Sequence, residues 1–288
     1  WSGEKVAMEN KRILITGGNS GIGKVAAIEL AKLGASMVLA CKPGDKTQAA
    51  LAEINAVARQ PAINLPVDLA SLESVRDLVG EFKQRYDSLD VLINNAGVFP
   101  ARKKLTDDGF ELQIGVNHLS HFLLTNLLLD VLKATPSARV VTVSSMLHKK
   151  GQIDFGSFRG EKKYNSQTAY AQSKLANVLF SVELARRLAV TDVTSNCLHP
   201  GGVRTDIMRD LPWLVRKLVD LMFITPQEGA KTTVKLASDS SLAEVTGKYF
   251  DQTRLESCSQ LAEDEDLCGQ LWQESEQLVE LSAGAERS

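Results

Sequence analysis

The sequence predicts an α/β protein with a doubly wound parallel sheet of about seven strands and helices on both faces. Strand-like apolar runs alternate with helical patterns along almost the whole chain. Continuous apolar strands that alternate with helices indicate a parallel sheet covered on both sides, and right-handed crossovers then wind it in both directions. The expected strands are Arg12–Thr16, Ser36–Ala40, Ile63–Val67, Val91–Asn94, Val140–Ser144, Val193–Leu198 and Lys248–Phe250.

The first strand runs into a glycine-rich turn that opens a helical pattern from Lys24 to Leu33. Glycines let the backbone turn sharply and approach a pyrophosphate, while a helix start offers free N–H groups and a positive dipole end. The alternative is an ordinary glycine-rich surface turn, but the strand–turn–helix context favours a Rossmann-type dinucleotide site. Cofactor contacts are expected from Gly17, Asn19, Ser20, Gly21, Ile22 and Gly23.

Tyr170 and Lys174 stand four residues apart on a predicted helix, so both side chains lie on one face. A free phenol has a pKa near 10, and an adjacent ammonium favours its ionised form. We therefore expect Lys174 to lower the pKa of Tyr170 and make it a general acid–base. An exposed helix pair without chemistry is the alternative, although no other tyrosine of the chain has a lysine four residues on.

Several motifs occur in a fixed order: the glycine turn, Asn94 to Gly97 after a strand, Asn117 in a helix, a serine pair after a strand, the Tyr170–Lys174 pair, and Pro200-Gly201. Together they resemble the short-chain dehydrogenase/reductase family. The stretches 115–125, 173–180 and 198–201, with the tail around Trp272, resemble its retinol dehydrogenase branch most closely. The resemblance runs from about Lys11 to about Leu281.

The end of the second strand bears on the choice of cofactor. An acidic residue at this position binds the 2′-hydroxyl of NAD. Here the strand ends at Cys41 and Lys42, so a positive charge replaces the acid. We therefore expect NADP(H), bound by its 2′-phosphate. NAD(H) stays open, because lysine lacks the bidentate fork of arginine, and Lys42 as a solvated turn residue is the alternative.

The resemblance implies roles for the next two strand ends. Asp68 and Leu69 would lie near the adenine ring, although Asp68 also fits a cap for the following helix. Asn95, Ala96 and Gly97 would let the backbone approach the adenine-side ribose, with Asn94 structural.

For catalysis, the resemblance implies the set Asn117, Ser145, Tyr170 and Lys174. Ser145 would orient the substrate carbonyl and stabilise negative charge on its oxygen, while Ser144 packs at the strand end. Asn117 sits inside an apolar helix, an awkward place for an amide, and would hold a water that joins Lys174 to a proton relay. Lys174 would also bind the nicotinamide ribose.

Beyond the sixth strand, Pro200, Gly201, Val203 and Thr205 are expected at the nicotinamide, with Thr205 on its carboxamide. The apolar, helix-spaced segment 206–225 is expected to form a substrate lid, with a core helix as the alternative. Segment 256–288 is read as an acidic tail that contains an amphipathic helix.

Length and composition narrow the class of protein. No linker or repeat divides the 288 residues, so we expect one dinucleotide-binding domain over 1–288. The net charge of −2, without a basic block, argues against nucleic acid. No apolar run reaches the roughly 18–20 residues of a membrane span, and there is no signal-peptide pattern. Four cysteines without metal spacing indicate an intracellular protein, cytoplasmic or peripheral to a membrane.

Four histidines raise the question of a metal. His118 and His121 share a helix face, but no third and fourth ligand match them, and no metal is expected. The function expected is an NADP(H)-dependent oxidoreductase, a carbonyl reductase or retinol dehydrogenase, acting on a small lipophilic and retinoid-like substrate. A homodimer stays open. The alternatives are a reductase of a steroid, polyketide or tetrapyrrole, and a non-catalytic nucleotide-binding regulator, against which the complete catalytic set argues.

Overall fold

The computed structural model describes residues 8–201 and 225–281 of the chain. Their strands form one sheet in the order β3-β2-β1-β4-β5-β6-β7-β8. All neighbours pair in parallel except β7 and β8, which are antiparallel. The strands are β1 (Arg12–Thr16), β2 (Ser36–Cys41), β3 (Ile63–Pro66), β4 (Val91–Asn94), β5 (Arg139–Val143), β6 (Thr194–His199), β7 (Tyr249–Asp251) and β8 (Arg254–Glu256).

The predicted fold class is confirmed, and the ends of all seven predicted strands lie within one residue of the predicted positions. The strand that was not predicted from the sequence is β8, which is three residues long and exposed throughout. It carries no apolar alternation, and therefore gives no pattern of burial to detect.

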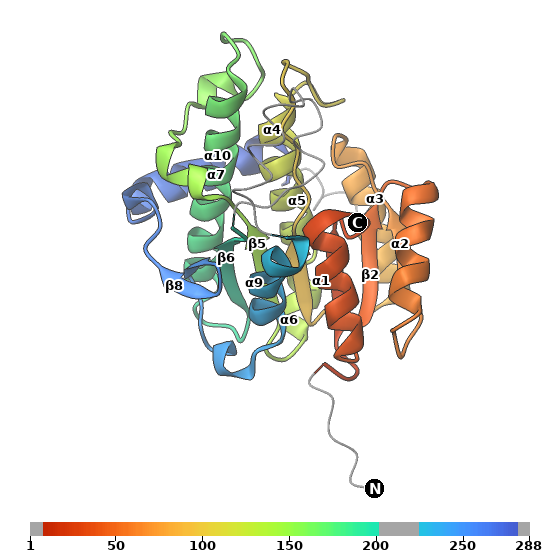
Figure 1. The fold of residues 1–288 in the computed structure, drawn as a ribbon. Helices are drawn as coiled ribbons and strands as arrows, with labels where there is room; N and C mark the ends of the chain where they lie inside the picture. Colours follow the sequence, from red (N-terminus) through yellow and green to blue (C-terminus); the bar gives the residue numbers. More distant parts are fainter. Residues whose placement is uncertain (1–7, 202–224, 282–288) are drawn as a thin grey trace, which may run out of the picture.

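Helices cover both faces of the sheet (Figure 1). Successive residues of a strand point to opposite sides. Leu14 of β1 packs in one core cluster with residues of α3, α5 and α7, while Ile13 and Ile15 pack with α1 and α9 on the other side. The helices are α1 (Gly21–Lys32), α2 (Asp45–Asn55), α3 (Leu72–Arg85), α4 (Leu112–Ile114), α5 (Ser120–Leu127), α6 (Leu129–Ala134), α7 (Ser166–Arg187), α9 (Pro226–Ser238) and α10 (Glu265–Leu278).

The amphipathic helix expected within 256–288 is α10. Asp264 caps it by accepting the N–H of Leu267 at 3.0 Å, and two further acids occupy its first turn, where negative charge is favourable. Its Trp272 packs against Phe122 with ring centroids 4.9 Å apart. Arg187 of α7 lies over the same indole, 4.3 Å from its centroid. The last described helix is thus fixed to the layer that carries α5 and α7.

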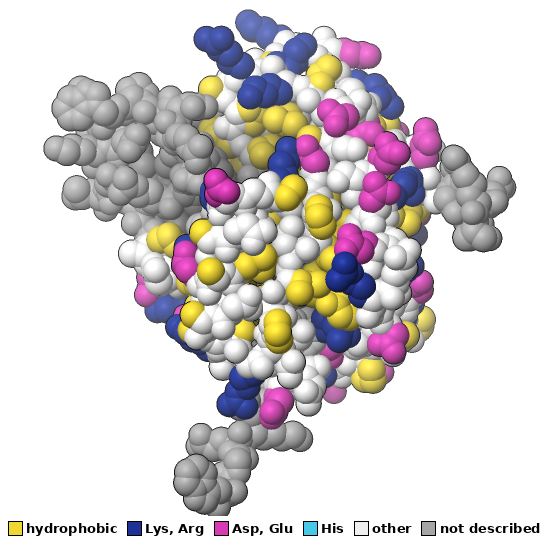
Figure 2. All heavy atoms as spheres, turned by 90° about the vertical axis from the view of Figure 1, so that its right-hand side faces the viewer, with side chains coloured by type: hydrophobic (Ala, Val, Ile, Leu, Met, Phe, Trp, Pro, Cys, Tyr) yellow, Lys and Arg dark blue, Asp and Glu magenta, His cyan; other side chains and the backbone are white. Residues whose placement is uncertain are grey.

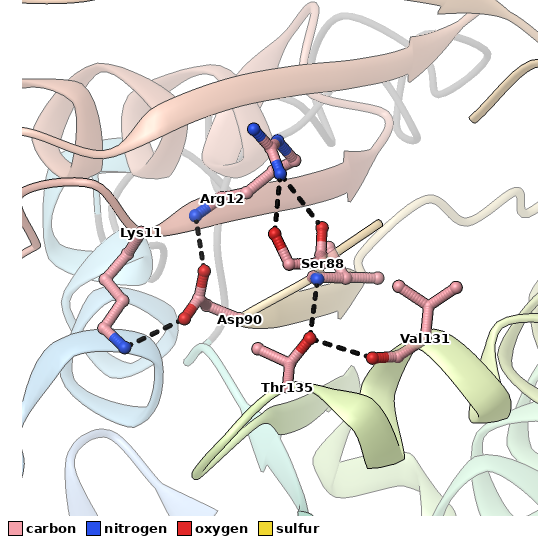
Figure 3. Close-up of polar contacts among 7 residues, drawn as sticks. Lys11, Arg12, Ser88, Asp90, Val131 and Thr135 are labelled. Carbon is pink, nitrogen blue, oxygen red and sulfur yellow. Dashed lines mark hydrogen bonds and ion pairs between the residues drawn. The ribbon is translucent and has the colours of Figure 1, made fainter. Parts of the chain in front are cut away.

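The amino ends of β1 and β4 are joined by a group of polar contacts (Figure 3). Asp90 accepts the backbone N–H of Arg12 at 2.8 Å and the ammonium of Lys11 at 2.9 Å. The Arg12 guanidinium donates to the Ser88 hydroxyl at 2.8 Å. Thr135, after α6, accepts the N–H of Leu89 at 3.0 Å. These bonds fix the register of the two central strands at the edge opposite the glycine turn.

The molecular surface carries both signs of charge. Figure 2 shows the side on which α2 and α3 lie, with acidic and basic side chains interspersed among apolar ones. Within 8–201 and 225–281, every helix is too short or too polar to cross a membrane.

Candidate active site

Within the described residues, each sequence motif either follows a strand of the parallel sheet or lies on a helical segment packed against the sheet. The glycine turn follows β1, Lys42 follows β2, Asn95 follows β4 and Ser145 follows β5. Carboxyl ends of parallel strands meet at one edge, and β1 and β4 are the pair at which the strand order reverses. Such a switch point is where open α/β sheets bind ligands.

The glycine turn leaves the start of α1 open to an anion. Gly17 and Gly21 have φ angles of 66° and 51°, a region that side chains disfavour. A Cβ on Gly17 would also lie only 3.1 Å from Ala96, so glycine favours the close approach of the two loops. The N-cap residue Ser20 makes no side-chain cap bond, and the first turn of α1 carries no acid. Its N–H groups therefore suit a pyrophosphate.

Thr16, the last residue of β1, ties this turn to the loop after β4. Its hydroxyl accepts the N–H groups of Asn95 at 2.9 Å and Ala96 at 3.0 Å. The Asn95 side chain returns a bond to the Thr16 carbonyl at 2.8 Å. Asn94 turns the other way, into the core, where it donates to Thr125 at 2.9 Å. Sequence reasoning missed Thr16, although its place directly before the glycines was a usable signal.

At the far end of the edge, Lys42 forms an ion pair with Asp68 at 2.5 Å. The two side chains are 66% and 38% exposed. Burial alone would raise the pKa of the Asp68 carboxyl, but the bonds from Lys42 and the N–H of Ala70 lower it below its ordinary value. The residues expected at the 2′-phosphate and at the adenine ring are therefore partners of each other.

Neighbouring residues hold the loop after β2. Asn19 donates to the hydroxyl of buried Thr47 at 2.8 Å, and that hydroxyl donates to the Lys42 carbonyl at 2.7 Å. Burial raises the pKa of Cys41 to about 11, so it stays a thiol. Leu69 is buried in the core cluster of α3 and α5 and does not stand free at the edge.

Helix α7 carries Tyr170 and Lys174 one turn apart, as the spacing predicts. The Lys174 ammonium lies 5.6 Å from the centroid of the Tyr170 ring and donates to the carbonyl of Val143 at 3.1 Å. Ser145, two residues beyond β5, lies close enough to Tyr170 to favour its ionised form and lower its pKa in part. Ser144 is buried and donates to the Lys174 carbonyl at 2.7 Å. Ser145, Tyr170 and Lys174 thus meet at one place.

Asn117 joins this group from η1 (Gly115–Leu119), a π-helical turn between α4 and α5. π-Helical turns are rare and occur often at functional sites. The Asn117 amide oxygen accepts the N–H of Val98 at 2.7 Å, and its NH₂ donates to the Val98 carbonyl at 3.1 Å and to Ser173 at 3.0 Å. A Cβ on Gly97 would lie 3.4 Å from both the Asn117 oxygen and the Lys174 nitrogen.

The expected lowering of the Tyr170 pKa is wrong. Burial raises it to about 12, and the nearby Ser145 hydroxyl lowers it only in part. The ammonium of Lys174 faces the ring and the Val143 carbonyl, which explains why it does not offset the burial. Burial also lowers the pKa of Lys174 to about 8. Near neutral pH the pair is a protonated phenol beside a lysine that is close to its titration point.

One apolar side chain packs against the tyrosine, and another follows Ser145 in the chain. Phe99 meets the Tyr170 ring edge-on at 4.8 Å between centroids. Met146, directly after Ser145, is 56% exposed. Neither was singled out from the sequence, although each stands within two residues of a motif. Phe99 thus offers apolar surface at the tyrosine, and Met146 offers exposed apolar surface next to Ser145 in the chain.

The last expected cofactor contacts are only partly described. Pro200 and Gly201 follow β6 and are buried, and Gly201 has a φ of 96°. Val203, Thr205 and nearly all of the expected lid 206–225 lie outside the described residues. Thr225 is described, and caps α9 by accepting the N–H of Glu228 at 3.2 Å.

Three of the four histidines, His118, His121 and His148, form side-chain hydrogen bonds. His118 bonds Ser275 of α10 at 2.9 Å, and His148 bonds the Ser145 carbonyl at 2.6 Å. Within the part of the chain that the structure describes, no three His, Cys, Asp or Glu side chains gather as metal ligands do.

Comparison with known proteins gives concordant results. The short chain dehydrogenase family matches residues 11–213. Human retinol dehydrogenase 14 is 44% identical, over 97% of this chain and 89% of its own. Human retinol dehydrogenase 13 is 42% identical, over 98% and 88%. An uncharacterised protein of Mycobacterium paratuberculosis superposes with a TM-score of 0.78 at 36% identity, covering 94% of each chain. The Pseudomonas aeruginosa RhlG/NADP active-site complex gives 0.71 at 22%, covering 86% of this chain and 97% of its own.

Proposed function

The chain belongs to the short-chain dehydrogenase family, and we propose that it is an NADP(H)-dependent oxidoreductase that interconverts a lipophilic carbonyl and its alcohol. A retinoid-like substrate is favoured, because relatives at 42–44% identity over nearly the whole chain are retinol dehydrogenases. The proposal rests mainly on one observation. Four polar side chains meet at the carboxyl edge of the sheet, beside the uncapped start of α1: Ser145, Tyr170, Lys174 and Asn117.

The residues at the carboxyl edge of the sheet suit the successive parts of an NADP(H) molecule. The turn from Gly17 to Gly23 and the start of α1 would hold the pyrophosphate. Lys42 would meet the 2′-phosphate, with Asp68 near the adenine. The loop from Asn95 to Gly97 would line the ribose, and the segment from Pro200 to Thr205 would hold the nicotinamide. When bound, the nicotinamide supplies or accepts the hydride.

The side chains handle the proton. Ser145 would donate to the substrate oxygen and support the negative charge that develops there. Tyr170 would give its phenolic proton to that oxygen in reduction and take it back in oxidation. The phenol is protonated at neutral pH and can therefore donate in the reducing direction, while a pKa of about 12 makes it a weaker acid than a phenol whose pKa lies near neutrality. Lys174, held by Val143, would pass on the replacement proton, and Asn117, held by Val98, would hold the water that joins Lys174 to the relay.

The apolar surface of Phe99 and Met146 favours a lipophilic substrate, since pockets for such ligands are mostly apolar with few fixed polar groups. The same surface would accept a steroid, polyketide or tetrapyrrole. A non-catalytic nucleotide-binding regulator has no use for a serine, a tyrosine and a buried lysine in contact.

The test is a turnover assay that follows NADPH absorbance with all-trans-retinal, a steroid ketone and a short hydrophilic aldehyde, and identifies the alcohol product by chromatography. We expect turnover with retinal and little with the hydrophilic aldehyde. Binding of NADPH without turnover of any carbonyl would replace the proposed enzyme by the regulator. Faster turnover of the hydrophilic aldehyde would end the lipophilic assignment.

A further inference from the structure

A buried histidine that the proposed chemistry does not use joins the two halves of the site. His121, in the first turn of α5, is 1% exposed. Its Nε2 lies 2.8 Å from the Thr16 hydroxyl, and its Nδ1 lies 3.1 Å from the Asn117 carbonyl oxygen. Thr16 ends β1 just before the glycine turn, whereas Asn117 belongs to the catalytic group. One imidazole therefore spans the distance between them.

The partners of His121 fix its tautomer. A carbonyl oxygen only accepts, so Nδ1 carries the hydrogen that faces Asn117. The Thr16 hydroxyl already accepts two backbone N–H groups, from Asn95 and Ala96, which occupy both of its lone pairs. Its own hydrogen then points to Nε2, 2.8 Å away, in preference to the Ile93 carbonyl at 3.5 Å. A charged imidazole would put an N–H against that hydroxyl, and burial, which lowers the His121 pKa to about 4, opposes the charge as well.

The two partners of His121 hold opposite ends of one loop. Thr16 fixes the start of segment 95–98 through two amide bonds. Asn117 fixes its end, because its amide bonds both the N–H and the carbonyl of Val98. Gly97 lies between these two attachments and against Lys174. Any shift of the His121 ring would change the spacing between the attachments.

We infer that His121 is a positioning residue: through Thr16 it sets the loop that meets the cofactor, and through Asn117 it sets the proton relay. The inference rests on the proposed function and deepens it, since it assigns separate effects on cofactor affinity and on turnover to the two nitrogens of one ring.

Two substitutions test the two ring nitrogens of His121 separately. His121→Asn keeps a donor at the position of Nδ1 and removes the acceptor for Thr16. His121→Gln extends an acceptor to the position of Nε2 and removes the donor to Asn117. Losing one buried hydrogen bond costs a factor of about five to ten. We expect the asparagine variant to bind NADPH that much more weakly with kcat at saturation retained, and the glutamine variant to lose kcat with affinity retained.

His118→Asn is the matched control, because it removes the Nε2 contact of a buried histidine in the adjoining turn η1, whose partner, Ser275, lies in α10. It should lower the melting temperature without separating affinity from kcat. If both His121 variants change affinity and kcat in parallel, or change only the melting temperature, the ring has a purely structural role and the inference is overturned.

The tautomer gives a readout that needs neither substrate nor turnover. Nitrogen-15 spectra of histidine-labelled protein should show His121 neutral with its hydrogen on Nδ1, assigned by its absence in His121→Gln. The amide signals of Asn95 and Ala96 should shift in His121→Asn and stay in place in the glutamine variant. A hydrogen on Nε2 would overturn the inference even in an active enzyme. A wild-type protein with the expected tautomer and no turnover would instead remove the proposed function alone.

Discussion

Replacing Lys42 by alanine tests how the protein distinguishes NADPH from NADH. A charged bond to a phosphate is worth about 1.5–3 kcal/mol. The ion pair with Asp68 must be given up or shared when a phosphate arrives, and an exposed pair of this kind is worth about 0.2–1 kcal/mol. The difference is roughly 0.5–2.8 kcal/mol, which corresponds to an NADPH preference of about two- to a hundredfold. Lys42→Ala should abolish that preference.

Asp68→Asn should act in the opposite direction. Freeing Lys42 recovers the pair energy, so the NADPH preference should increase by about 1.4- to fivefold. A contact of Asp68 with the adenine ring would be common to both cofactors and cancels in the ratio of their dissociation constants.

Both cofactors would be titrated by nicotinamide fluorescence against wild type, the two variants and a control. Lys83→Ala is the control, because Lys83 is also an exposed lysine paired with an acid, Asp130, at 2.7 Å, but on α3. An unchanged ratio of dissociation constants in Lys42→Ala would refute the assignment of the 2′-phosphate to this lysine. A lower NADPH preference in Asp68→Asn would refute the competition between Asp68 and the 2′-phosphate for Lys42.

Three further predictions concern the chemistry and the scaffold. Tyr170→Phe should reduce turnover by at least about a hundredfold, the scale of acid–base catalysis, with NADPH affinity retained by titration. The kcat/KM of carbonyl reduction should fall as pH rises through about 8, because Lys174 loses its charge there while Tyr170, with a pKa of about 12, keeps its proton. Asp90→Ala should lower the free energy of unfolding in urea by about 1–3 kcal/mol, since it leaves the N–H of Arg12 without its partner, and should leave kcat unchanged.

Each of these has a contrary outcome. Near wild-type turnover in Tyr170→Phe would mean that another group supplies the proton. A flat pH profile from about pH 7 to 9 would show that the charge of Lys174 is not needed. A fall in kcat for Asp90→Ala, measured well below its unfolding midpoint, would couple the amino edge of the sheet to the site.

The sequence predicts the sheet well because its central strands are buried on both faces. Such strands read as continuous apolar runs, and their ends follow from the polar residues that bound them. Tyr170 and Lys174 were predictable for a similar reason, since helical spacing alone puts them on one face. Their roles, and those of Ser145 and Asn117, stay predictions until the variants are measured.

Features that depend on neighbours in space were not predictable. The pairing of Lys42 with Asp68 follows from β2 and β3 lying side by side, a fact of topology and not of spacing. The pKa of Tyr170 depends on burial by the assembled fold, which outweighs the lysine one turn away. The amide of Asn117 looked out of place in a helix because the local pattern does not reveal a π-helical turn.

Both borders of the sheet are unsuited to further strand pairing. At one border, β3 is four residues long and ends in Pro66, which has no N–H to donate. At the other, β8 is three residues long, runs antiparallel to β7 and carries Arg254 and Glu256. Short, charged or proline-containing edges oppose the strand-by-strand growth that leads to aggregation. If copies of this protein associate in solution, we expect helices and loops to form the contact, so that the sheet ends within each molecule.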